Sequence, residues 1–186
     1  MDSKTKWNTK YIERLNELIE PVPSPRLKNQ SVYLNGGTAL DLACGLGGNS
    51  LFLARMNYQV DAIDISDVAI NYIEDQASKY NLKIHPRVCD LTDFNNLSWP
   101  NDSFNIVVIS YYLDRSLFPI VKSIIKEGGC LFMETFYQSP KTENQGVSNH
   151  YKLQPRELLV EFGDWNVVFF EENEHEGRQT IFCQKQ

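Results

Sequence analysis

The sequence has no excess of basic residues. Its 186 residues include 24 acidic and 18 basic side chains, which gives a formal net charge of −6. Proteins that grip nucleic-acid phosphates usually carry a positive surface, so we expect no nucleic-acid partner. A mildly acidic chain of this size is more typical of a protein that handles small molecules.

The sequence also lacks a long apolar run. No stretch approaches the ~20 apolar residues of a membrane-spanning helix, and residues 1–7 are polar, without the apolar core of a secretory signal. We therefore expect a cytoplasmic protein with no membrane partner. The length predicts one domain over residues 1–186, present as a monomer or homodimer.

Cysteine is sparse, with four residues far apart in the chain and no C-x-x-C pair. Metal ligands are usually more closely spaced, so we predict no metal site. Each cysteine falls in an apolar run, where a free thiol behaves as a small hydrophobic group. We expect four buried free thiols, which fits a reducing compartment: Cys44, Cys89, Cys130 and Cys183.

Strand-like and helix-like patterns alternate along most of the chain. The alternation predicts an α/β fold, a Rossmann-like, doubly wound and mostly parallel seven-stranded sheet with an antiparallel hairpin at one edge. Ligands of such sheets bind outside the carboxyl ends of the strands. The predicted strands cover 38–42, 59–65, 84–88, 104–110, 130–136, 165–172 and 179–184. The predicted helices cover 1–20, 49–56, a long segment after Ser66, 118–125 and 155–162, with a weaker pattern at 26–35 and a polar loop at 137–153.

We divide the predicted domain into three parts. Residues 1–30 form an N-terminal helix and lid, 38–135 the ligand-binding core, and 136–186 a loop, a helix and the hairpin. In the first helix, Trp7 and Tyr11 either close the pocket or pack the helix on the sheet, and packing is the favoured interpretation. The apolar face of this helix is predicted to comprise Trp7, Tyr11, Ile12, Leu15, Leu18 and Ile19.

The strongest signal is a strand that runs into a glycine loop and then a helix, between Leu40 and Leu51. Glycines let the backbone approach a ligand closely. A P-loop is excluded because no lysine lies between residues 29 and 78, and a dinucleotide fingerprint read from Gly45 would need glycine where Ser50 stands. Asp64, about 20 residues further on, suits ribose hydroxyls and disfavours a 2′-phosphate.

Five motifs in order resemble those of class I S-adenosylmethionine-dependent methyltransferases, over residues 38–135. The first is Asp41-x-Ala43-x-Gly45-x-Gly47, with alanine where the family usually has glycine. The others are Val60–Asp64, Val88–Leu91, the strand Phe104–Ser110, and the turn Glu127-Gly128-Gly129.

This resemblance implies an enzyme with S-adenosylmethionine as cofactor and S-adenosylhomocysteine as product. It implies that Asp64 holds the ribose and that Asp90 lies near the adenine amino group. The implied cofactor contacts are Asp41, Ala43, Cys44, Gly45, Gly47, Asn49, Asp64, Ile65, Asp90, Leu91 and Ser110.

A finer resemblance is to the small tellurite-resistance and thiopurine-type methyltransferases. It rests on the glycine-loop motif and on Pro155-Arg156-Glu157-Leu158 with Trp165, whereas residues 175–186 depart from that group in spacing. It implies a small-molecule methyl acceptor, such as a soft thiol or chalcogen nucleophile. An ionised soft acceptor needs no base, and for other acceptors the candidate bases are Tyr137 and His150.

Alternatives remain at the level of residues and of function. Asp41, Asp64 and Asp90 could each be structural acids that bond to backbone N–H groups or turns. The alternative functions are an NAD-dependent oxidoreductase and a non-catalytic nucleotide-binding domain of the same fold.

Overall fold

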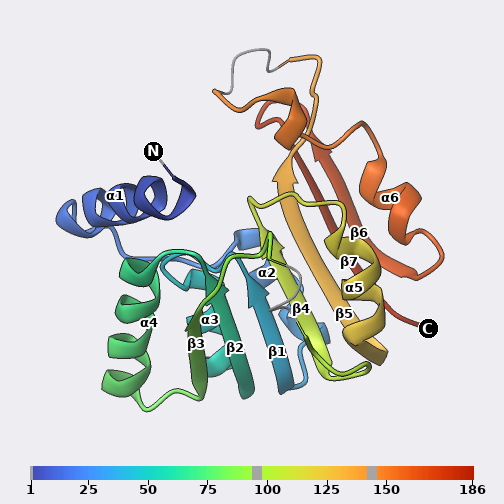
Figure 1. Ribbon diagram of the computed structural model, residues 1–186. Coiled ribbons are helices and arrows are strands. Elements are labelled where there is room, and N and C mark those ends of the chain that lie inside the picture. Colours follow the sequence, from blue (N-terminus) through green and yellow to red (C-terminus); the bar gives the residue numbers. More distant parts are fainter. Residues whose placement is uncertain (1, 94–97, 142–145) are drawn as a thin grey trace. The chain divides into compact units, whose positions relative to one another are not determined.

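A computed structural model describes residues 2–93, 98–141 and 146–186 (Figure 1). The chain divides into two compact units, Met1–Trp99 and Pro100–Gln186. Each unit is described by itself, and the single domain over residues 1–186 stays a prediction.

The first unit contains a parallel three-stranded arrangement in the order β3-β2-β1. β1 and β2 are largely buried, whereas β3 is mostly exposed. Helix α3 packs on β2 and α4 on β3, and α1 packs on α4. The elements are α1 (Ser3–Asn16), α2 (Pro25–Asn29), the 3-10 turn η1 (Ser31–Tyr33), β1 (Gly37–Leu42), α3 (Gly48–Arg55), β2 (Tyr58–Asp64), α4 (Asp67–Tyr80) and β3 (Ile84–Val88).

Helix α4 shows why its limits could be predicted. The hydroxyl of Ser66 accepts a hydrogen bond from the Ala69 N–H at 3.2 Å and caps the first turn. The helix ends at Tyr80 and is capped by Asn81, whose φ of 51° is left-handed. Its buried side, which includes Ile70 and Ile73, has helical spacing.

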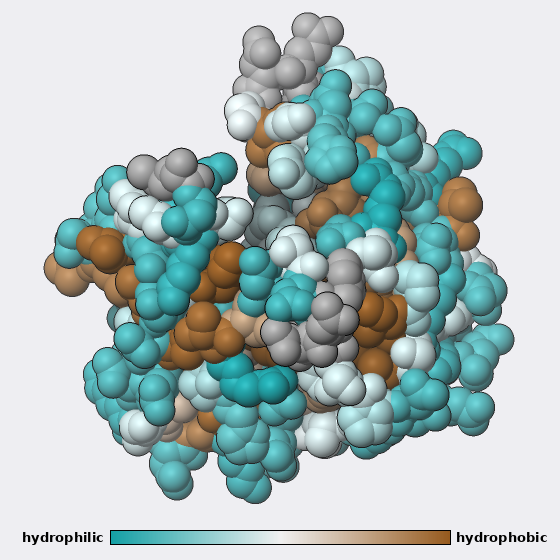
Figure 2. Space-filling model, viewed as in Figure 1, coloured by the Kyte–Doolittle hydropathy of each residue, from teal (hydrophilic) through white to brown (hydrophobic). Residues whose placement is uncertain are grey.

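The prediction for the N-terminal helix is wrong at its end. α1 stops at Asn16, because Leu18 takes a left-handed φ of 55°. Leu18, Ile19 and Ile12 are exposed, so the inward face is narrower than predicted and centres on Tyr11. Apolar surface is visible around α1 in Figure 2.

The second unit contains four strands in the order β4-β5-β7-β6. β4 and β5 are parallel, while β7 pairs antiparallel with both β5 and β6. The predicted antiparallel hairpin at an edge is thereby confirmed as β6–β7. The elements are β4 (Phe104–Ser110), α5 (Leu117–Ile124), β5 (Ile125–Phe136), the 3-10 turn η3 (Asn149–Tyr151), α6 (Glu157–Phe162), β6 (Asn166–Asn173) and β7 (Arg178–Gln184).

Strand β5 begins earlier than predicted. It starts at Ile125, directly after α5, and Gly128 and Gly129 lie inside it. The N–H of Gly128 donates to Lys185 O at 2.9 Å, and the N–H of Lys185 donates to Gly129 O at 2.9 Å. A Cβ at Gly129 would lie 3.1 Å from Asn105 O, so close strand packing explains this glycine.

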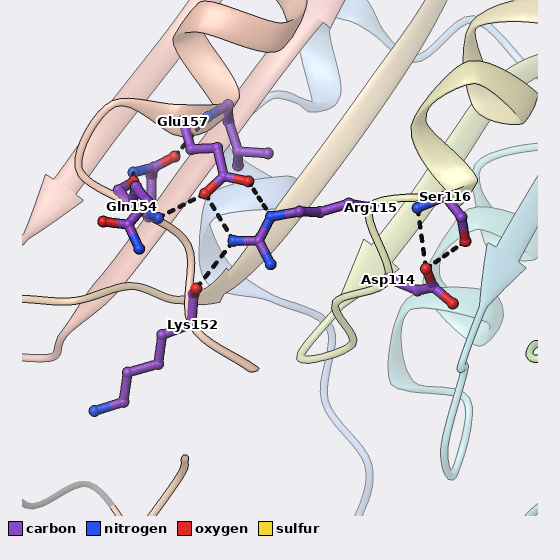
Figure 3. A network of polar contacts seen from close by, with 8 residues as sticks. Asp114, Arg115, Ser116, Lys152, Gln154 and Glu157 are labelled. Atoms are coloured by element: carbon purple, nitrogen blue, oxygen red, sulfur yellow. Dashed lines mark hydrogen bonds and ion pairs between the residues drawn. The ribbon is translucent and has the colours of Figure 1, made fainter. Parts of the chain in front are cut away.

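The polar loop at 137–153 is more structured than predicted, although residues 142–145 lie outside the described part. Leu153 bridges Tyr137 as an isolated β-bridge. Figure 3 shows how the following segment is held: Arg115 donates to both carboxylate oxygens of Glu157, at 2.5 and 2.8 Å, and to Lys152 O at 3.2 Å. Burial raises the pKa of Glu157, but the hydrogen bonds from Arg115 and the Gln154 N–H together with the positive charge of Arg115 outweigh it, and the pKa is lowered.

The four cysteines are free, as predicted. Cys130 and Cys183 are buried, but Cys44 and Cys89 are only half-buried, so the expectation of four buried thiols is wrong for these two. Cys44 follows β1 and Cys89 follows β3; at Cys44 it is the thiol group that is shielded, whereas the residue as a whole is half-buried. In the described ranges no helix has the length and apolar character to cross a membrane, and no group of possible ligands could hold a metal.

Candidate functional site

The glycine loop follows β1 and turns the chain through three left-handed residues. Ala43, Gly45 and Gly47 have φ values of 55°, 54° and 79°. The N–H of Gly47 donates to Cys44 O at 3.0 Å and closes the turn from which α3 begins. The left-handed φ at Ala43 explains why glycine is usual at this motif position, since an L side chain is strained there.

Asp41 lies beneath this loop and is 1% exposed. The Ser50 hydroxyl donates a hydrogen bond of 2.6 Å to Asp41 Oδ2. Burial raises the pKa of Asp41 to about 7, the Ser50 hydrogen bond opposes this, and the negative charge of Asp64 adds to it. From the sequence, Ser50 served only to argue against a dinucleotide fingerprint, and its role as the partner of this acid was missed.

Asp64 ends β2 and faces the same loop. Its Oδ2 accepts from the Gly45 N–H at 2.8 Å and its Oδ1 from the Ser66 N–H at 2.9 Å. Burial raises the pKa of Asp64, and these backbone hydrogen bonds oppose the rise. A carboxylate has about four acceptor positions, so the backbone donors fix its orientation and leave it able to accept from a ribose hydroxyl.

A cavity of about 530 Å³ is lined by Ile65, which follows Asp64 in the chain, and by Asp90, both of them predicted contacts. Arg87, Cys89 and Lys4 of α1 also line it. Asp90 has a structural role as well, because its Oδ1 accepts from both the N–H and the hydroxyl of Thr92. The fixed Asp64 carboxylate, the tight loop and this cavity suit a nucleoside-containing cofactor such as S-adenosylmethionine.

The other predicted contacts lie in more varied settings. Burial raises the pKa of the Cys44 thiol well above its usual range. Asn49 Oδ1 accepts from the Ser24 N–H at 2.9 Å and so holds the segment before α2. Leu91 is buried. Ser110 ends β4 in the second unit, and its contact with the cofactor stays a prediction.

The two candidate bases belong to the second unit. Tyr137 is buried, and burial raises its pKa, so the phenol is a poor base near neutral pH. His150 is exposed in η3, with its ring 5.0 Å from that of Tyr151. Both roles stay predictions.

A polar cluster in the second unit was missed by sequence reasoning. Glu134 of β5 is 1% exposed and accepts from the Tyr111 hydroxyl at 3.2 Å and the Thr180 hydroxyl at 3.1 Å. Arg178 Nη1 donates to the Tyr111 hydroxyl, and its guanidinium lies 5.5 Å from the centre of that ring. The available signal was a charged residue inside the apolar strand sequence Cys130–Phe136.

The left-handed loop after the first parallel strand and the buried acid at the end of the second lie where the resemblance to class I S-adenosylmethionine-dependent methyltransferases predicts them. A family model described as "Tellurite resistance protein TehB" matches residues 24–181. The chain belongs to this family. Membership confirms the tellurite-resistance resemblance and gives no support to an NAD-dependent oxidoreductase.

Individual relatives agree with this membership. A probable S-adenosyl-L-methionine-dependent methyltransferase TehB from Haemophilus influenzae (strain 10810) is 25% identical over 144 residues, covering 76% of this chain and 50% of that protein. Phosphoethanolamine N-methyltransferase 1 from Arabidopsis thaliana is 26% identical over 129 residues, covering 66% of this chain and 26% of that protein. The chain therefore spans half or less of the length of these curated relatives.

A solved structure supports the fold. TehB from Haemophilus influenzae superposes with a TM-score of 0.79 at 18% identity, covering 97% of this chain and 67% of that chain. The predicted Rossmann-like α/β class, with mostly parallel strands and an antiparallel edge hairpin, is confirmed.

Proposed function

We propose that this chain transfers the methyl group of S-adenosylmethionine to a small-molecule acceptor that attacks through a soft thiol or chalcogen atom. The observation that carries the proposal is the Asp64 carboxylate, which the N–H groups of Gly45 and Ser66 hold and which precedes the cavity residue Ile65 in the chain. The family description, which names resistance to tellurite, favours a soft acceptor. We also propose that the protein is a monomer or a homodimer.

The protein's own task in such a reaction is binding and alignment. When bound, S-adenosylmethionine supplies an activated methyl group, so alignment with the acceptor accounts for most of the required catalysis. Asp64 would hold the ribose hydroxyls, and Ile65 and Asp90 the base. The buried Asp41 supports the loop through Ser50.

The polar cluster in the second unit suits the acceptor. Arg178 is about a quarter exposed, and its buried Nε has no hydrogen-bond partner in the described part of the chain. Glu134, the Tyr111 hydroxyl and an ion pair with Glu176 at 3.1 Å orient the guanidinium, and its remaining N–H group at Nε could donate to an oxyanion. We therefore propose an anionic acceptor, and Arg178→Gln should raise its KM while leaving S-adenosylhomocysteine binding unchanged.

Calorimetry with S-adenosylhomocysteine tests the cofactor assignment. Asp64→Ala should weaken binding tenfold or more, since hydrogen bonds to a charged group contribute roughly 1.5–3 kcal/mol each. Asp61→Ala is the matched control, because Asp61 lies in the same strand and pairs with exposed His85 instead. Unchanged binding by Asp64→Ala would refute the ribose role.

An acceptor panel tests the reaction. Thiols, chalcogen oxyanions, amines and phenols are each incubated with S-adenosylmethionine, and formation of S-adenosylhomocysteine is measured. We expect the thiol or chalcogen acceptors to react fastest. Cofactor binding without turnover of any acceptor would instead favour the non-catalytic binding domain.

A further inference from the structure

One face of α1 reaches both the glycine loop and the cavity of the first unit. Lys4, Asn8 and Tyr11 follow one another at spacings of four and three residues, which places them on one side of a helix. Lys4 lines the cavity, and Tyr11 lies against Gly45. The helix therefore covers the region that we assign to the cofactor.

Tyr11 is 6% exposed, and its ring packs with Leu46 and Ala69 and stacks on Trp7 at 5.7 Å. Its hydroxyl oxygen lies 3.0 Å from the position that a Cβ would take at Gly45. No hydrogen bond joins this hydroxyl to another described residue. Packing explains the buried ring, but it does not explain why a donor is directed at the glycine loop.

Burial, the nearby carboxylate of Asp64 and the Cys44 thiol raise the pKa of Tyr11. The phenol therefore remains protonated over the physiological pH range and keeps its donor. The phenol can approach the loop this closely because residue 45 is glycine, since a side chain there would collide with the Tyr11 hydroxyl.

Asn8 fixes α1 in this position. Its Nδ2 donates to Asp67 Oδ1 at 2.7 Å, and its Oδ1 accepts from the Ser66 hydroxyl at 2.5 Å. The N–H of Ser66 donates in turn to Asp64. Lys4 adds an ion pair to Asp67 at 2.9 Å. A continuous set of hydrogen bonds thus joins the N-terminal helix to the carboxylate that we assign to ribose.

We propose that Tyr11 is a cofactor-binding residue whose hydroxyl donates to the methionine carboxylate, and that Asn8 is the positioning residue that holds α1 over the site. The inference rests on the proposed function. In the proposed function Asp64 binds the ribose and the cavity holds the adenine base. The glycine loop therefore remains to bind the amino-acid part of the cofactor. A carboxylate is the part of that group that best accepts from a phenol.

Two ligands separate this contact from general packing. S-adenosylhomocysteine carries the amino-acid part, and 5′-methylthioadenosine lacks it. Calorimetry should show that Tyr11→Phe weakens S-adenosylhomocysteine binding about tenfold and leaves 5′-methylthioadenosine binding unchanged. Tyr80→Phe, at a half-exposed tyrosine of α4, is the control. Equal losses for both ligands, or no loss, would overturn the contact.

Hydrogen exchange of α1 tests the positioning role. S-adenosylhomocysteine should increase protection of α1 in the wild type, and Asn8→Ala should reduce both this protection and the affinity. Asn16→Ala, an exposed asparagine of the same helix, should do neither. If neither the ligand nor Asn8→Ala changes the hydrogen exchange of α1, the positioning role of Asn8 is overturned. If Asp64→Ala still abolishes binding, the proposed function survives such a result, whereas a wild type that binds no S-adenosylhomocysteine overturns both.

Discussion

Ionisation of Asp41 should make the protein without cofactor less stable as the pH rises. Its folded-state pKa is about 7 against an ordinary value of 3.8, and it is almost completely buried. Because the folded pKa is raised, the folded protein binds more protons than the unfolded chain between about pH 4 and pH 7. Stability therefore falls as the pH rises through this window, and the full cost is present above pH 7.

The magnitude follows from the two pKa values. One pKa unit corresponds to about 1.4 kcal/mol, so the ionised Asp41 costs about 4 kcal/mol at high pH. Between pH 5 and pH 8 the change amounts to about 3 kcal/mol. Burial raises the pKa of Asp64 too, which adds a loss of the same sign.

Urea unfolding of the protein without cofactor at pH 5, 6, 7 and 8 measures this effect. In Asp41→Asn the amide oxygen still accepts from the Ser50 hydroxyl but cannot ionise. Between pH 5 and pH 8 the free energy of unfolding of the wild type should fall by about 3 kcal/mol more than that of Asp41→Asn. Asp75→Asn, at an exposed position of α4, should follow the wild type. Parallel curves for wild type and Asp41→Asn would refute the reasoning.

Three further substitutions are tested by the same unfolding measurement. Ala43→Gly should stabilise the protein by ~0.5–1 kcal/mol, because relief of the left-handed strain exceeds the entropy cost of glycine; lower stability would contradict the strain. Gly48→Ala should destabilise by ~1–3 kcal/mol, since its Cβ would lie 2.3 Å from Val22 O; unchanged stability would argue against that close contact. Arg115→Lys should lower the free energy of unfolding by about 1 kcal/mol, because lysine cannot donate two parallel hydrogen bonds to Glu157 as arginine does. An unchanged free energy of unfolding would mean that this contact does not stabilise the fold.

The parts of the fold that the sequence predicted best are those whose burial is local and continuous. β4 has the predicted bounds, since an apolar run bordered by polar residues marks a buried strand. β3 also has its predicted bounds, although it is mostly exposed and its sequence is not an apolar run. The end of α1 was missed because Leu18 continues the apolar spacing although its backbone leaves the helix. The start of β5 was missed because a glycine pair favours a break, whereas here pairing with Lys185 keeps it in the strand.

The candidate site shows the same division. The motif order identified Asp41 and Asp64, because each follows from its place at the end of a strand. Their partners were not identified, since neither the Ser50 hydroxyl bond to Asp41 nor the Ser66 backbone N–H bond to Asp64 can be read from residue spacing. The contact of Arg115 with Glu157 joins residues 42 positions apart, which pattern reasoning on one sequence cannot pair.

The electrostatics of the loop bear on which cofactor the fold can hold. Asp41 and Asp64 are both buried beside it, and the charge of Asp64 raises the pKa of Asp41. A pyrophosphate would bring further negative charge to this pair, which low-dielectric surroundings make costly. The sulfonium and ammonium groups of S-adenosylmethionine outweigh its one carboxylate, so this cofactor would instead offset the repulsion between the two acids. The same two acids that cost the empty protein stability therefore favour a cationic cofactor over a dinucleotide, independently of the glycine spacing.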